Sequence, residues 1–239
     1  MMPSSRSLLA LLATTSVLGV GLVAVPAQAE MTRSLNLNGA TGLIDMPSGE
    51  VQDDATFSFT MSNIGPMTRA TFSFQFSERV SASFRFNTWR DWNTLFPAAD
   101  EKHVDRSIDL HYQILKEGDF LPAVTIGLID LTGKGLMSSE YIAATKNFGE
   151  RLKVTAGLGW GRMGSNDSIG QPFGARPALT SSDYGRPQFD QWFRGDMAPF
   201  AGVEYKLNDR WTFKGEYSSD AYVMEDDERG LLEHKSPFN

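Results

Sequence analysis

The chain has 239 residues, of which 41% are hydrophobic and 11% aromatic, with 22 glycines and no cysteine. This composition is that of a folded protein and excludes a disordered or collagen-like chain. Its 22 basic and 29 acidic residues give a formal net charge of −7, which excludes nucleic acid as a partner because the required positive surface is missing. Without cysteine we expect no disulfides, no thiolate metal site and no lipid-bearing N-terminal cysteine.

The first thirty residues have the parts of a secretory signal. Arg6 supplies a positive charge, residues 8–25 are apolar, and Ala27-Gln28-Ala29 has the small-x-small pattern of a cleavage site. A transmembrane anchor is the alternative, but two glycines and a proline interrupt the apolar stretch next to the cleavage site. We therefore expect residues 1–29 to be a signal peptide and the protein to be exported.

Residues 30–54 form a polar lead with many glycines and no helical periodicity. From about Ala55 to the end of the chain, apolar residues recur at every second position, which is typical of strands with one apolar and one polar face. In the run 140–146 the two faces are ambiguous, because Tyr141 and Ile142 fall on opposite sides. The runs are 57–62, 69–76, 80–86, 107–114, 124–128, 140–146, 152–160, 201–207 and 211–217.

The connections between these runs alternate in length. Residues 76–80, 148–152 and 207–211 share one plan, in which a bulky apolar residue, a small residue, an acid, an arginine and a second bulky residue follow each other. Longer connections occupy residues 87–104, 132–138 and 161–196. Short turns at one end and long loops at the other are typical of outer-membrane barrels.

We predict an all-β fold, an antiparallel up-and-down transmembrane β-barrel of about nine strands over residues 55–239. Strands of about eight to eleven residues are long enough to cross a bilayer, whereas soluble strands are usually shorter. Aromatic residues near the strand ends fit an interfacial belt. These aromatic residues are Phe76, Trp160, Tyr205, Trp211 and Tyr217. A soluble sandwich also alternates, so a soluble fold stays open as an alternative.

An odd number of strands is unusual for a single-chain bacterial barrel, and in lipid every strand edge must be paired. Residues 235–239 resemble the start of a further strand. We therefore expect the chain to be the incomplete, N-terminal portion of a larger barrel protein.

The polar faces supply the candidate functional residues. We expect seven of their side chains to line a watery lumen, where mixed charges suit a hydrated polymer. They are Arg69, Gln75, Arg85, Asp109, His111, Gln113 and Lys153. Trp89 and Trp92 are candidates for contact with sugar rings, with interfacial anchoring as the alternative. Asp105, Asp109 and Glu140 could serve a glycosidase only if two of them flank one sugar bond.

Other patterns predict no cofactor or metal. Residues 159–164 match G-x-G-x-x-G, but no helical pattern follows to hold a pyrophosphate. The three histidines are far apart, which disfavours a metal site. We interpret the acidic run 225–228 as a solvated turn or loop in preference to a cation site.

Several longer stretches resemble the YjbH-like family of exopolysaccharide-biosynthesis outer-membrane proteins. They are residues 39–48, 136–146, 157–161, 216–222 and 236–239. The resemblance implies a non-enzymatic β-barrel in the cell outer membrane that takes part in the biosynthesis and export of exopolysaccharide or capsule. The implied partners are outer-membrane lipid, exopolysaccharide and other polysaccharide-export proteins. The alternative is a secreted soluble β-protein that binds or hydrolyses polysaccharide.

Overall fold

The computed structural model describes residues 31–91, 102–226 and 236–239. The predicted signal peptide and Trp92 lie outside these ranges. In the described part, nine antiparallel strands form one sheet in chain order. The strands are β1 (Phe57–Ile64), β2 (Met67–Gln75), β3 (Val80–Trp89), β4 (His103–Leu115), β5 (Ala123–Ile129), β6 (Ser139–Phe148), β7 (Leu152–Gly161), β8 (Met197–Lys206) and β9 (Thr212–Tyr217).

The alternating pattern predicted all nine strands, and the structure extends several of them. β3 and β4 reach to Trp89 and His103, which pair with each other beyond the alternating segments. The three turns with the shared plan join β2 to β3, β6 to β7 and β8 to β9. Strand pairing therefore continues past the point where hydrophobic alternation in the sequence ends.

The two faces of the sheet differ in polarity, and the apolar one is exposed. Phe72 and Phe84 on the outer face are 44% and 45% exposed, whereas Arg85 between β2 and β4 on the inner face is 0% exposed. This is the inverse of a water-soluble sheet, which buries its apolar face. We call the exposed side the apolar outer face. Its large residues include Phe57, Phe59, Met61, Phe72, Phe74, Phe84, Ile108, Leu110, Tyr112, Ile142, Val203, Tyr205 and Phe213.

The closed barrel that we expected is not confirmed, because the sheet is open in the described residues. Its order runs from β1 to β9 without a pairing between these two strands. At the β9 edge, Phe238 forms an isolated antiparallel bridge with Tyr217, and the expected further strand stays a prediction. The Asn239 N–H donates to the Glu216 carbonyl over 3.0 Å, and the Glu216 N–H donates to the Asn239 carbonyl over 3.1 Å.

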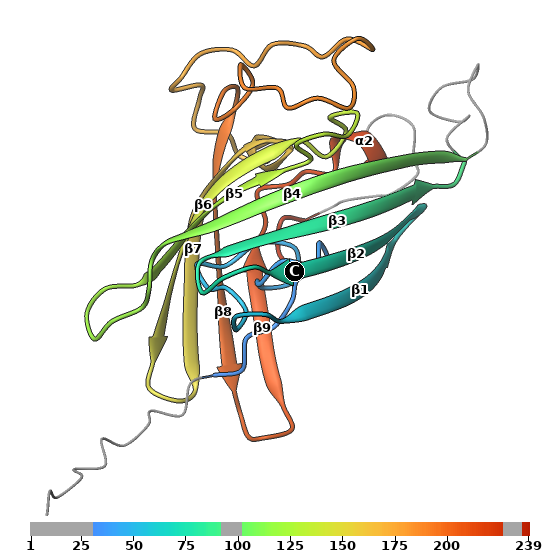
Figure 1. Ribbon diagram of the computed structural model, residues 1–239. Coiled ribbons are helices and arrows are strands. Elements are labelled where there is room, and N and C mark those ends of the chain that lie inside the picture. The colour runs from blue at the N-terminus through green and yellow to red at the C-terminus, as the bar shows by residue number, and fades with distance from the viewer. Residues whose placement is uncertain (1–30, 92–101, 227–235) are drawn as a thin grey trace, which may run out of the picture.

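Residues 31–56, which we call the lead segment, lie against the inner face of this strongly twisted sheet (Figure 1). The lead segment contains isolated bridges, Leu35 with Thr41 and Gly42 with Pro47, but no regular strand. Its Leu43 and Met46 belong to one buried apolar cluster with residues of the sheet. The lead segment and the sheet therefore form one packed unit. The sheet side of that cluster is Ile129, Tyr141, Ala143, Met163 from the turn after β7, and Phe200.

The helices within the described residues are short. A 3₁₀ turn, η1 (Arg162–Gly164), follows β7, and one helical turn, α2 (Val223–Asp226), follows β9. Among the residues that the structure describes, no helix is long and apolar enough to cross a membrane.

Candidate functional site

All seven predicted lumen residues are buried inside the curved sheet. None of them is more than 6% exposed. Gln113 lines a cavity that opens near the short turns, whereas Arg69, Arg85 and Lys153 contact the lead segment. The structure therefore brings the seven residues to one interior and adds a segment of the same chain as their main neighbour.

On the β2–β4 side, the lead segment meets the sheet through its backbone carbonyls. Ser73 Oγ donates to the Gly39 carbonyl over 2.7 Å, and Arg69 Nη1 donates to the Leu37 carbonyl over 3.3 Å. Arg85 Nη2 forms an ion pair with Asp109 Oδ1 at 2.5 Å, with both side chains buried. Arg85 Nη1 also donates to Asn38 Oδ1 at 3.3 Å, so residues 37–39 of the lead segment are held against β2 and β3.

Gly49 anchors the lead segment to the centre of the sheet. Its carbonyl accepts hydrogen bonds from Gln113 Nε2 at 3.1 Å and Thr125 Oγ1 at 2.8 Å, and its N–H donates to Thr145 Oγ1 at 2.8 Å. A Cβ atom at this position would lie 2.2 Å from the Ala123 carbonyl oxygen. The close approach of the two backbones therefore requires glycine here.

A buried ion pair follows Gly49. Lys153 Nζ lies 2.7 Å from Glu50 Oε2 and 4.0 Å from Glu204 Oε1. Burial raises the pKa of Glu50, and the ion pair with Lys153 opposes that rise. Lys153 therefore compensates the negative charge that the lead segment brings into the interior.

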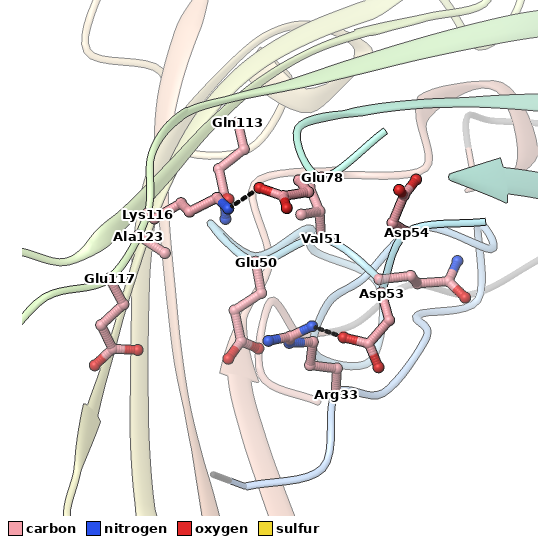
Figure 2. Close-up of a pocket in the computed structure, with 11 residues that line it drawn as sticks. Arg33, Glu50, Val51, Asp53, Asp54, Glu78, Gln113, Lys116, Glu117 and Ala123 are labelled. Atoms are coloured by element: carbon pink, nitrogen blue, oxygen red, sulfur yellow. Dashed lines mark hydrogen bonds and ion pairs between the residues drawn. The ribbon is translucent and has the colours of Figure 1, made fainter. Parts of the chain in front are cut away.

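Beside this ion pair, a cavity of about 390 Å³ opens near the short turns (Figure 2). Glu50 lies on its wall, together with the ion pairs Arg33–Asp53 and Glu78–Lys116. The Glu50 end of the Glu50–Lys153 ion pair therefore borders this cavity.

Glu216 on β9 holds the middle of the lead segment. Its carboxylate accepts the N–H groups of Ile44 at 2.9 Å and Asp45 at 2.8 Å. Next to it, Lys214 Nζ donates to the Leu43 carbonyl at 2.9 Å. Burial raises the pKa of Asp45 to about 6, although the hydrogen bond from the Tyr222 hydroxyl opposes the shift. The lead segment is thus fixed by charged groups of β7 and β9.

At the end with the long loops, the acidic run contributes a buried charge. Arg162 lies 2.6 Å from Asp220 Oδ2 and 3.0 Å from Glu225 Oε2. Glu225 also accepts the Trp89 indole N–H at 3.3 Å and is 0% exposed. Our interpretation of this run as solvated is therefore wrong for Glu225, because Glu225 pairs with Arg162, which lies 63 positions earlier in the chain.

Trp89 is packed between Met67 and Met137 and is fully buried. In this conformation its ring serves packing and the hydrogen bond to Glu225. Contact with sugar at Trp89 stays a prediction, and its predicted companion Trp92 lies outside the described residues.

The long connection before β8 covers part of the apolar outer face. Arg176 forms a bidentate ion pair with the outward-facing Glu140, at 2.7 and 2.9 Å. Phe173 and Phe193 of the same loop contact Trp160, with ring centroids 6.3 and 5.1 Å away. Trp160 is therefore buried under a loop, which corrects its assignment to an interfacial aromatic belt.

The three acids considered for a glycosidase do not form such a pair in this conformation. Glu140 pairs with Leu128, and Leu128 pairs with Leu110, so all three lie on the outer face. Asp105 and Asp109 are at odd-numbered positions of β4 and therefore lie on the inner face. Asp105 and Asp109 are four residues apart on β4, or about 13 Å at the rise of a strand. Glycosidase carboxyl groups are about 5–9.5 Å apart.

Sequence reasoning missed several residues that fix the lead segment. Lys214 and Glu216 have the alternating spacing of β9, so their inward direction could have been inferred from the sequence. Glu50 follows no periodic pattern, and its ion pair with Lys153 could not be inferred. Among the described residues, no group of three or more His, Cys, Asp or Glu could hold a metal ion.

These features define an all-β protein with an apolar exterior and a charged interior that holds its own N-terminal segment. The sequence model of the YjbH family, described as that of an exopolysaccharide biosynthesis protein, matches residues 34–239. The chain belongs to this family, as the sequence resemblance predicted.

The chain is also similar to part of a longer curated protein. The chain is 28% identical over 213 residues to the "Uncharacterized lipoprotein YjbH" of Escherichia coli (strain K12). The match covers 84% of this chain and 30% of the relative, so the chain spans less than a third of that protein. No solved structure matches the chain.

Proposed function

We propose that this chain forms part of the wall of an outer-membrane β-barrel that serves exopolysaccharide export without catalysing a reaction. The observation that carries the proposal is the inverted burial of the sheet. Outward Phe, Leu, Ile and Tyr side chains are exposed along its strands, and inward Arg, Asp, Lys and Glu side chains are buried.

This arrangement is unfavourable in water and favourable in a bilayer. A continuous apolar surface exposed to water loses the free energy that burial of apolar area provides, and it promotes association. Facing lipid tails, the same surface is matched to its surroundings, while the polar side chains stay inside. Backbone groups at the sheet edges must also be paired in lipid. Further strands added at the β9 edge, where Phe238 is already bridged, would complete such a sheet.

The family supplies the link to polysaccharide. Its description as an exopolysaccharide biosynthesis protein fits a path whose walls carry hydroxyl, amide and charged groups. The name of the E. coli relative, a lipoprotein, fits a protein of the cell envelope. In this proposal the partners are outer-membrane lipid, the exopolysaccharide and other polysaccharide-export proteins.

Charge placed on the apolar outer face tests the proposal. Phe74 is on that face, and Phe74→Arg should cost about 2–4 kcal/mol at bilayer depth and reduce insertion. Glu78→Arg, in the exposed turn after β2, is the matched control. The measurement is fractionation of expressed protein, with a urea wash and with boiled and unboiled samples compared on a gel.

Urea-resistant outer-membrane material that shifts on boiling, lost in Phe74→Arg and kept in Glu78→Arg, supports the proposal. Wild-type protein recovered as soluble material would instead support a secreted β-protein that binds or hydrolyses polysaccharide. Equal insertion of both variants would show that Phe74 does not face lipid.

A further inference from the structure

The inner face of β2, β3 and β4 carries polar residues at four consecutive inward positions of each strand, next to the apolar pair Met67–Trp89. Cross-strand neighbours form four rows, so that hydroxyl, amide, carboxylate and guanidinium groups cover a continuous surface. We call this surface the polar wall. Its rows are Arg69–Asn87–Asp105, Thr71–Arg85–Ser107, Ser73–Ser83–Asp109 and Gln75–Ser81–His111.

Much of the hydrogen-bonding capacity of the polar wall is unused within the described part of the chain. Seven of its residues have a buried side-chain atom without a hydrogen-bond partner there. These atoms are Thr71 Oγ1, Gln75 Oε1, Arg85 Nε, Asn87 Nδ2, Asp105 Oδ2, Ser107 Oγ and His111 Nε2. Buried polar groups are normally paired, so a concentration of unpaired ones on one surface indicates that water or a polar ligand completes its hydrogen bonds.

On the opposite side of the interior, the inward side chains are mostly paired, although Asn147 Oδ1 on β6 has no partner within the described residues. Lys153 and Glu216 bind the lead segment directly, and Thr145 and Thr155 bond each other at 2.8 Å. Their side chains are not among the unpaired buried groups. The lead segment is therefore anchored on the β6–β9 side. It covers the polar wall but leaves many of the wall's hydrogen-bonding groups without a partner.

We propose that the polar wall binds a neutral, polyhydroxylated sugar chain, and that the lead segment competes with this sugar for the same surface. The inference rests on the proposed function. Two arginines and two aspartates balance in charge, and the many hydroxyl and amide groups match both the donors and the acceptors of sugar hydroxyls. Hydrogen bonds from Ser73 and Arg69 to lead-segment carbonyls occupy the wall, so sugar and lead segment exclude each other there.

Competition has a measurable consequence. When two partners exclude each other, weakening one raises the apparent affinity for the other. Lys153→Met removes the partner of Glu50 on the anchoring side and leaves the polar wall intact, so sugar should bind more tightly. Lys153→Arg keeps the charge and should behave like the wild type.

The test uses the full chain reconstituted in lipid, with maltoheptaose and dextran oligomers as probes in titration calorimetry. Thr71→Val with Ser107→Ala removes two hydroxyls that make no hydrogen bond within the described chain, so the fold should persist. We expect this double variant to raise the Kd for the probes at least tenfold. Thr155→Val on the opposite side should stay within twofold of the wild type, and Lys153→Met should lower the Kd at least threefold.

Unchanged binding in the double variant would overturn the proposal, as would an unchanged Kd in Lys153→Met. Lipid-inserted wild-type and Lys153→Met proteins that bind neither probe would also overturn it, and so would binding of polygalacturonate in place of the neutral probes. Insertion is measured separately by flotation with the vesicles. Protein that fails to float with lipid contradicts the proposed function itself, so the two failures are distinguishable.

Discussion

Asp130, directly after β5, is a buried acid in an unusual backbone conformation. Its φ of 61° lies in the left-handed region, which Asp and Asn tolerate better than most residues. Its Oδ2 accepts the Met137 N–H at 3.0 Å, and its own N–H donates to Asp109 Oδ1 at 2.8 Å. Burial raises its pKa to about 7, and the nearby charge of Asp105 adds to the shift.

Asp130 should therefore make stability depend on pH. Its pKa rises from the ordinary value of 3.8 to about 7 on folding, so the folded protein binds this proton more tightly. The free energy of unfolding should rise as pH falls from 8 to about 4. Asp130→Asn keeps an acceptor for the Met137 N–H without the charge, and it should stabilise the protein at pH 8 by about 1–4 kcal/mol.

Denaturant unfolding at pH 5 and pH 8 measures this effect. We expect Asp130→Asn to flatten the pH dependence, with a residual slope from Asp45, whose pKa is raised to about 6. Asp119→Asn, in the exposed turn between β4 and β5, is the control and should keep the wild-type profile. A lower unfolding midpoint for Asp130→Asn at pH 8 would contradict the assignment.

At the level of elements, hydrophobic alternation predicted the strands. Apolar and polar residues alternate along a strand whether the apolar face is buried or exposed. The alternation also predicted the inward direction of Arg85 and Lys153. The faces of β6 were ambiguous because Tyr141 is inward despite its size. Its hydroxyl is 2.8 Å from His111 Nδ1, a partner that only the three-dimensional pairing supplies.

The position of the lead segment could not be predicted, since it has no period and no regular strand. Its contacts reach residues from 32 to 172 positions away, such as Arg69 and Glu216. A local pattern does not encode contacts at such separations. Gly49 was visible in the sequence only as one glycine among several, and its importance comes from the distance to the Ala123 carbonyl.

The docking of the lead segment should fail when Gly49 gains a side chain. The added Cβ atom would meet backbone on β5, which cannot move without disturbing the sheet. We expect Gly49→Ala to cost about 1–3 kcal/mol, the usual effect of overpacking. Chymotrypsin should then cut at Leu37 and Leu43 faster than in the wild type.

Gly118→Ala is the matched control, because no atom lies within 4 Å of a Cβ at that position. Its cleavage rate should equal that of the wild type. If Gly49→Ala protects Leu43 from cleavage as well as the wild type does, the lead segment does not depend on this close approach.

For the whole molecule, the polarity of the two faces and the open edge at β9 have one physical explanation. In the proposed function the apolar exterior faces lipid, and a sheet in lipid needs paired edges. The family match confirms the relationship to exopolysaccharide biosynthesis. The lead segment explains why a charged interior can be buried, because it supplies partners for Lys153, Lys214 and Glu216.

The environment of the outer face can be measured directly, because a chain without cysteine accepts single labels. Phe72→Cys places a nitroxide on the apolar outer face in the middle of β2, and Glu78→Cys places one in the exposed turn. In reconstituted protein, a lipid-facing nitroxide relaxes faster with oxygen, which concentrates in hydrocarbon, than with a water-soluble nickel chelate. We expect oxygen to dominate at position 72 and the nickel chelate at position 78. Dominance of the chelate at both positions would mean that the apolar outer face meets water or protein, and the membrane assignment would then be wrong.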